Sequence, residues 1–205
     1  MTVEIKPNVD EAGIATWLHG RLTAALEATP GDVTICLPGG STPFPILERL
    51  AFMEFDWSRL VVWPGDDRCV PEDHVASNAG RMRSLLDPVG ARLVPLAEDA
   101  SPPRFAMTWL GMGEDGHIAS LFPNTDPQAD DPARVIRITP DPLPPEAPFD
   151  RISLTIPALL DAAEVLFVIR TPKKRAVFEE AMRGENDLPV ARLLAAAQQP
   201  VTCFT

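Results

Sequence analysis

The chain has 205 residues, of which 45% are hydrophobic and 23% charged, and its formal net charge is −11 at pH 7. This size and composition predict one globular domain spanning residues 1–205, and the acidic balance disfavours nucleic acid and anionic membranes as partners. The three scattered cysteines form no metal-binding motif, and neither a secretory leader nor an apolar run of membrane length is visible, so a cytoplasmic location is expected.

The first half of the chain alternates between helical and strand patterns. Apolar residues at helical spacing predict an amphipathic helix over residues 10–28, and the β-branched run over residues 33–37 predicts a buried strand. A helix is expected to begin near Pro43, because proline suits the first helical turn. A second buried strand is predicted over residues 60–63, followed by a helix over residues 77–86 whose first residue is the N-cap.

The second half of the chain continues this alternation after a segment rich in proline and aspartate at residues 124–148. Strands are predicted over residues 105–110, 135–138, 151–156, 165–169 and 201–204, and helices over residues 172–182 and 189–197. Continuous apolar strands that alternate with helices predict a single-domain, three-layer Rossmann-like α/β fold with a mostly parallel central sheet. Ligands bind beyond the carboxyl ends of such strands, which directs attention to three polar loops.

The first of these loops is Gly39-Gly40-Ser41-Thr42-Pro43. Paired glycines allow backbone N–H groups to approach a ligand closely, and the start of a helix favours an anion. The loop is therefore expected to be either a phosphate or carboxylate cradle, or a tight strand-to-helix turn capped by a hydroxyl.

The second loop contains Asp66-Asp67-Arg68. An arginine can bind a phosphate with two parallel hydrogen bonds. Asp66 is expected either to hold Arg68 or to handle a proton, which makes it a catalytic candidate. The alternative is a cluster of surface ion pairs without a catalytic role.

The third loop, GMGEDGH at residues 111–117, contains G-x-G-x-x-G directly after a predicted strand, the fingerprint of dinucleotide binding. That interpretation is disfavoured for three reasons. The carboxylates of Glu114 and Asp115 would stand where a pyrophosphate must dock, and the segment lies in the middle of the chain rather than in the first strand-to-helix turn. Pro123 would also break a crossover helix within about two turns.

An acid–base pair explains this third loop better. Asp115 and His117 lie two residues apart between glycines. Histidine titrates near neutrality and can take a proton from water, while a neighbouring carboxylate orients the ring and stabilises its charged form. The alternative is a histidine that only completes a turn. His19 and His74 have no comparable context, so they are expected to be structural.

Positive charges open two further segments. Arg151 begins a predicted strand, and Lys173 and Lys174 open a predicted helix. Cations at a helix N-terminus oppose the helix dipole, so a bound phosphate would explain their position. The alternative is a solvated run of charges on a helix surface.

Taken in chain order, these segments resemble the 6-phosphogluconolactonase branch of the family that also contains the glucosamine-6-phosphate isomerases/deaminases. The most specific stretch is GMGEDGHIASLFP at residues 111–123, and the resemblance covers most of the chain. It also rests on residues 39–43, 66–68, 70–71, 77–78, 151–155 and Lys174. The resemblance implies a Rossmann-like fold and hydrolysis of 6-phospho-D-glucono-1,5-lactone to 6-phosphogluconate, without a metal or an organic cofactor.

The resemblance also implies roles for individual residues. His117 is expected to be the general base that activates water, with Asp115 as its partner. Contacts to the phosphate and the rest of the substrate are expected from Gly39, Gly40, Ser41, Thr42, Arg68, Arg151 and Lys174. The sequence departs from the family pattern in three segments. Pro38 replaces a serine, Asp67 replaces a glutamate, and Thr171-Pro172 replace a glycine-containing turn, which leaves Lys173 and Lys174 as alternative phosphate contacts.

Two other functions compete with lactone hydrolysis. A sugar-phosphate isomerase/deaminase of the same family would carry a glutamate soon after the histidine, but residues 120–123 are Ser-Leu-Phe-Pro. A non-catalytic sugar-phosphate binding domain would need neither Asp115 nor His117. The expected partner is therefore a small-molecule substrate, and the expected assembly is a monomer or a weak homo-oligomer.

Overall fold

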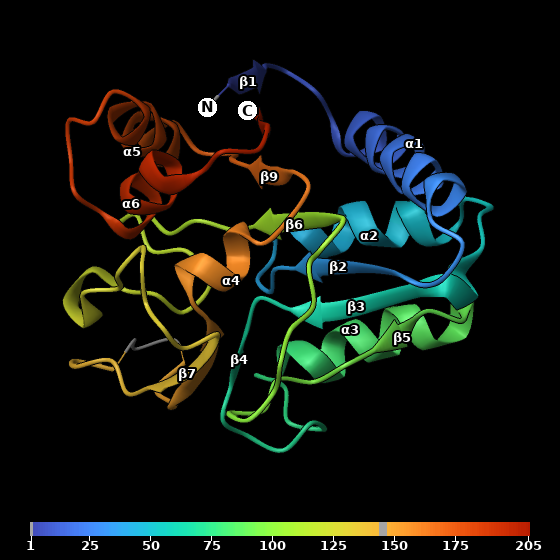
Figure 1. Ribbon diagram of the computed structural model, residues 1–205, viewed down its shortest axis with the longest axis horizontal. Helices are drawn as coiled ribbons and strands as arrows, with labels where there is room; N and C mark the ends of the chain where they lie inside the picture. The colour runs from blue at the N-terminus through green and yellow to red at the C-terminus, as the bar shows by residue number, and fades with distance from the viewer. Residues whose placement is uncertain (1, 144–146) are drawn as a thin grey trace.

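The computed structural model describes residues 2–143 and 147–205, and its main feature is a seven-stranded sheet (Figure 1). The strand order is β1-β10-β9-β6-β2-β3-β5, and every neighbouring pair is parallel. The strands are β1 (Val3–Lys6), β2 (Val33–Leu37), β3 (Leu60–Pro64), β5 (Arg92–Leu93), β6 (Met107–Leu110), β9 (Val165–Val168) and β10 (Val201–Phe204). The central strands are buried throughout, as expected for a parallel sheet covered on both faces.

Helices cover both faces of this sheet. They are α1 (Glu11–Ala28), α2 (Pro43–Ala51), α3 (Asn78–Leu86), α4 (Ile156–Leu160), α5 (Pro172–Met182) and α6 (Pro189–Ala196), with short 3₁₀ helices at Trp57–Arg59, Asp87–Val89 and Pro123–Thr125. Side chains of α1, α2 and α3 share one apolar cluster with Ile35 and Leu37 of β2, whereas those of α4, α5 and α6 share the other with Cys36. This alternation along β2 follows the two-residue period of a strand and gives the fold its three layers.

A second, three-stranded antiparallel sheet lies beside the first, with the order β4 (Asp66–Arg68), β8 (Arg151–Leu154), β7 (Val135–Ile138). Gly65 joins the two sheets: its N–H donates to Leu37 of β2 at 2.9 Å, and its carbonyl accepts from Leu154 of β8 at 2.9 Å. The chain therefore leaves the parallel sheet at the end of β3 and enters the second sheet one residue later. This junction places Asp66 immediately beyond the carboxyl end of β3.

The predicted α/β class and the mostly parallel sheet are confirmed, and most predicted elements appear within a few residues of their expected bounds. The segment predicted as one strand over residues 151–156 instead divides into β8 and the start of α4, because Thr155 caps that helix through its side chain. The second sheet and the strands β1, β4 and β5 were not predicted. In the described parts of the chain, no helix combines the length and hydropathy that crossing a bilayer requires.

Candidate active site

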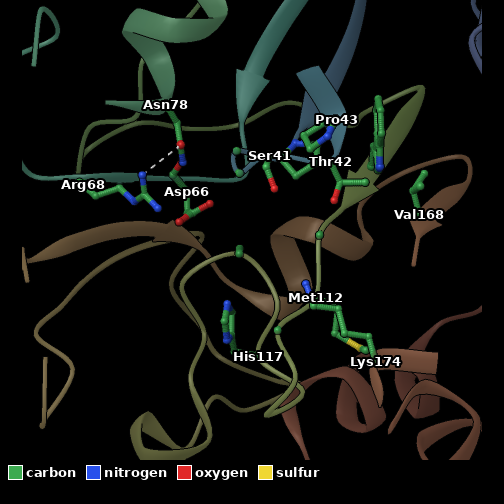
Figure 2. A pocket seen from close by; sticks show the side chains of 17 residues that line it. Ser41, Thr42, Pro43, Asp66, Arg68, Asn78, Met112, His117, Val168 and Lys174 are labelled. Atoms are coloured by element: carbon green, nitrogen blue, oxygen red, sulfur yellow. Dashed lines mark hydrogen bonds between the residues drawn. The ribbon is translucent and has the colours of Figure 1, made fainter. Parts of the chain in front are cut away.

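A cavity of about 240 Å³ lies at the carboxyl ends of four adjacent strands of the parallel sheet, β9, β6, β2 and β3 (Figure 2). Its walls come from the segments that follow these strands, which include all three polar loops identified in the sequence. The predicted site residues that line it are Gly39, Gly40, Ser41, Thr42, Asp66, Arg68, His117 and Lys174. Residues separated by more than a hundred positions in the chain therefore meet in one cavity.

The Gly39–Gly40 turn owes its shape to contacts that only glycine permits. A Cβ atom at Gly39 would lie less than 3.0 Å from the side-chain amide of Asn78, and Gly40 has a φ of 89°. The turn leads directly into α2, where Thr42 occupies the N-cap position without a side-chain capping hydrogen bond. The hydroxyls of Ser41 and Thr42 stand at the cavity wall, an arrangement that favours the cradle over the capped turn.

Asp67 fastens the start of α3 to β4. One of its carboxylate oxygens accepts hydrogen bonds from the backbone N–H groups of Asn78 at 2.6 Å and Arg68 at 2.8 Å. The other accepts from the N–H of Ala79 at 2.9 Å and from the hydroxyl of Ser77 at 3.2 Å. The aspartate is thus long enough to bind the first two backbone N–H groups of α3, although the family pattern has a glutamate here.

Arg68 is held at the cavity wall by the segment that precedes α3. Its Nη1 donates to the carbonyl of Ala76 at 2.8 Å and to Oδ1 of Asn78 at 3.5 Å, the contact drawn in Figure 2. Its buried Nε has no hydrogen-bond partner among the described residues, nor does the guanidinium form an ion pair with any described carboxylate. Arg68 therefore has a free donor and no carboxylate partner among the described residues, an arrangement that suits an anionic ligand.

His117 and Asp115 form the hydrogen-bonded pair predicted from the sequence. Nδ1 of His117 lies 2.6 Å from Oδ1 of Asp115, and the imidazole packs against Phe122 with ring centroids 4.7 Å apart. The hydrogen bond from His117 lowers the pKa of the Asp115 carboxyl, so this carboxylate stays ionised beside the ring. Because an ionised carboxylate only accepts hydrogen bonds, Nδ1 is the donor in this contact, and in a neutral imidazole Nε2 is then the acceptor.

The loop that carries His117 is positioned from two sides. Gly113 donates its N–H to the carbonyl of His117 at 2.9 Å, closing a tight turn beneath the ring. Gly116 has a φ of 77°, and its carbonyl accepts from the N–H of Val190 in α6 at 3.1 Å. A Cβ atom at Gly116 would overlap Leu188, so the close packing of this loop on the start of α6 requires glycine.

Asp66 is almost fully buried, with 8% of its surface exposed, although it lines the cavity. Its Oδ2 accepts a hydrogen bond from the hydroxyl of Ser120, and its backbone carbonyl accepts from the amide of Asn78 at 2.9 Å. Burial raises the pKa of the Asp66 carboxyl, against the opposing effects of Ser120 and Arg68. Ser120 was not predicted as a site residue; the only signal for it was its place three residues after His117.

Only one of the two candidate lysines lines the cavity. Lys174 is half-buried at the cavity wall, where the first turn of α5 begins after its Thr171 N-cap. Lys173 points elsewhere and forms an ion pair with Glu114 at 2.7 Å. This ion pair raises the pKa of Lys173 and connects α5 to the loop that carries His117. The structure therefore places Lys174, and not Lys173, where a ligand would bind.

Arg151 does not line the cavity. It pairs with Arg68 across β8 and β4, is only 3% exposed, and donates to the carbonyls of Phe149 at 3.0 Å and Ala147 at 2.7 Å. Burial, followed by the charge of Arg68, lowers the pKa of its guanidinium. The structure thus places Arg151 beside Arg68, where it supports a loop, rather than at the predicted substrate contact.

Comparisons with known proteins identify the family of this chain. The family model for glucosamine-6-phosphate isomerases/6-phosphogluconolactonase matches residues 10–92 and 88–202. A 6-phosphogluconolactonase from Pseudomonas putida is 35% identical over 205 residues, covering 90% of this chain and 83% of the relative, and one from Pseudomonas aeruginosa is 35% identical over 208 residues, covering 90% and 86%.

Solved structures of other proteins share this fold. The crystal structure of 6-phosphogluconolactonase from Thermotoga maritima has a TM-score of 0.84 at 23% identity and covers 99% of both chains, which establishes the fold. A putative 6-phosphogluconolactonase from Neisseria gonorrhoeae has a TM-score of 0.80 at 26% identity, covering 99% of this chain and 98% of its own. The chain therefore belongs to the glucosamine-6-phosphate isomerase/6-phosphogluconolactonase family.

Proposed function

We propose that this chain hydrolyses 6-phospho-D-glucono-1,5-lactone to 6-phosphogluconate, the second step of the oxidative pentose phosphate pathway, with His117 as the general base. The observation that carries the proposal is one cavity that holds both an imidazole oriented by Asp115 and a glycine turn at the start of α2. The relatives that are 35% identical over most of the chain bear the name 6-phosphogluconolactonase.

The His117–Asp115 pair supports the hydrolytic step. Nδ1–H of His117 donates a hydrogen bond to Asp115. Nε2 of His117 can then accept a proton from a water molecule in the cavity. The water oxygen then attacks C1 of the lactone, and a tetrahedral intermediate forms. The ionised Asp115 stabilises the imidazolium produced in this step, so the proton transfer does not leave an isolated charge.

The phosphate of the substrate would bind where the Gly39–Gly40 turn forms the cavity wall. The backbone N–H groups at the Gly39–Gly40 turn and the positive end of α2 favour an anion, and Arg68 and Lys174 supply two cationic side chains. These two cations matter because the whole chain carries a formal charge of −11, which repels an anionic substrate at long range. The cavity thus provides a local positive potential in a protein whose net charge is negative.

Ring-opening isomerisation or deamination is the second candidate within the same family, and the residues after His117 disfavour it. Phe122 packs on the His117 ring and Ser120 binds Asp66, so neither position supplies a carboxylate to shuttle protons. We propose instead a cofactor-independent enzyme that acts on one small-molecule substrate, 6-phospho-D-glucono-1,5-lactone. We expect it to act in the cytoplasm as a monomer or a weak homo-oligomer. Release of ammonia from glucosamine 6-phosphate would instead favour the second candidate.

The decisive experiment measures lactone opening above the spontaneous background for the wild type and for His117→Ala. Loss of a general base should lower kcat by roughly 100- to 10,000-fold while KM changes little. His19→Ala is the matched control, because His19 hydrogen-bonds the carbonyl of Glu54 and does not line the cavity. A wild-type rate no faster than the background, or a His117→Ala rate equal to that of the wild type, would contradict the proposal.

A further inference from the structure

The carboxyl group of Asp66 has no role in the steps described above, although it reaches the cavity. It approaches from the junction of β3 and β4, whereas His117 approaches from the loop after β6 (Figure 2). The sequence left two roles open for Asp66, holding Arg68 or handling a proton. Within the described residues Asp66 forms no ion pair, and Arg68 instead donates to Ala76 and Asn78. The structure thus leaves the proton-handling role.

The surroundings of Asp66 favour its neutral, protonated form. Oδ2 of Asp66 accepts one hydrogen bond, from the hydroxyl of Ser120, and no described protein group donates to Oδ1. A buried carboxylate without an ion-pair partner is costly, and burial raises the pKa of Asp66 accordingly. The titratable and charged groups around it are Arg68 and Asp67 on β4, Arg151 on β8, Cys36 on β2 and His117.

The neighbouring groups do not remove this preference for the neutral form. Arg68 and His117 favour the ionised form, but Asp67 opposes it, and the desolvation of the carboxyl exceeds them all. The thiol of Cys36 is also buried beside Asp66, and burial raises its pKa, so it stays neutral and offers no charge to pair with. Oδ1, which accepts no hydrogen bond from a described residue, is therefore the oxygen that is free to carry a proton.

Opening of a lactone requires an acid as well as a base. When the C1–O5 bond breaks, the ring oxygen leaves as an alkoxide, which is too basic to be expelled readily unless it is protonated. His117 removes a proton from the attacking water, and a second group on another wall of the cavity can protonate the leaving oxygen at the same time. Paired groups whose environments hold one as a base and the other as an acid are the usual arrangement for such chemistry.

We propose that Asp66 is the general acid that protonates the ring oxygen of the lactone. This inference rests on the proposed function. As the C1–O5 bond breaks, the electron pair goes to O5, the proton on Oδ1 of Asp66 moves to O5, and Asp66 becomes a carboxylate. His117 then holds the proton taken from water. That proton returns to Asp66, directly or through solvent. The new carboxylic acid at C1 releases its own proton to solvent, so the net reaction adds one water molecule and releases one proton.

The test compares Asp66→Asn on two substrates, the natural lactone and its analogue with sulfur in place of the ring oxygen. Asparagine keeps the shape and can still accept from Ser120, but it cannot transfer a proton. A thiolate leaves without protonation, because thiols titrate near about 8.5, far below alcohols. We expect kcat of Asp66→Asn to fall roughly 100- to 10,000-fold on the lactone and less than about tenfold on the thiolactone.

His117→Ala is the reference that separates this inference from the proposed function, because loss of the base should slow both substrates. If His117→Ala behaves in this way but Asp66→Asn loses equal activity on both substrates, or none on either, the role of Asp66 is overturned while the base remains. A wild-type pH profile provides a measurement without any variant. Its kcat/KM should fall at alkaline pH on the lactone but not on the thiolactone, and identical alkaline limbs would also overturn the inference.

Discussion

Gly113 packs so closely beneath the His117–Asp115 pair that one added methyl group should displace the imidazole. A Cβ atom built on this residue would lie less than 3.0 Å from Nδ1 and Cε1 of His117 and from Oδ1 of Asp115. Cβ atoms almost never lie within 3.0 Å of another side chain in real structures. The backbone of Gly113 is also held in place, because its N–H donates to the carbonyl of His117. In Gly113→Ala the side chains must therefore move, not the loop backbone.

The size of the effect follows from the size of this displacement. Restoring ordinary contact requires the His117 ring to move by more than about 1 Å, and a displacement of about 1 Å already costs on the order of 100-fold in rate. A 100-fold loss corresponds to about 2.7 kcal/mol in the activation barrier. The proposed phosphate contacts at residues 39–42 and at Arg68 come from other segments of the cavity wall, so KM should change by less than about threefold.

The assay is the initial rate of lactone opening at saturating substrate, corrected for the spontaneous reaction, together with a thermal unfolding curve for each variant. Gly111→Ala is the matched control in the same loop, because its Cβ would meet only Cβ of Pro38 at 3.7 Å, an ordinary contact. We expect this control to lose much less activity than Gly113→Ala. Full activity in Gly113→Ala, or equal losses in both variants, would refute the geometric argument.

Three other predictions follow from the cavity. Arg68→Ala should impair phosphorylated lactones far more than unphosphorylated ones in parallel kcat/KM measurements, since equal losses would show that Arg68 does not bind the phosphate. Lys174→Ala should raise KM for the phosphorylated lactone, whereas Lys173→Ala, which removes an exposed ion pair with Glu114, should leave it within about threefold. Asp66→Asn should gain stability relative to the wild type as pH rises. Because folding raises the pKa of Asp66, the wild type loses stability from about pH 4 up to that pKa, and the variant does not. A difference in unfolding free energy that stays constant with pH in urea unfolding would contradict the raised pKa.

The sequence was sufficient to predict the parallel sheet and the three loops of the cavity because both depend on local patterns. Buried strands read as short apolar runs, and parallel strands present their carboxyl ends at the same edge. β4 has the opposite character: Asp66–Arg68 are polar, and they form a strand only by pairing with residues 151–153 far along the chain. No local pattern encodes such a pairing, so the second sheet could not be predicted.

The same limit applies to individual side chains at the site. Lys173 and Lys174 are adjacent in sequence, and their different directions depend on the rotation of α5 and on the contact with Glu114. Arg151 matches a family motif, but its guanidinium donates to the carbonyls of residues 147 and 149, because tertiary packing places these residues beside it. Residue type and spacing identified the chemistry, whereas tertiary packing decided which side chains reach the cavity.

The four hydrogen bonds accepted by Asp67 have a consequence for how this region opens. Because the amides of Asn78 and Ala79 are bound to a side chain of β4, they can exchange with deuterium only when α3 separates from the second sheet. Protection of these two amides would therefore report the opening of the whole segment that carries Arg68. Slow exchange there, compared with the faster exchange of exposed turns, would identify β4 and α3 as one cooperative folding unit.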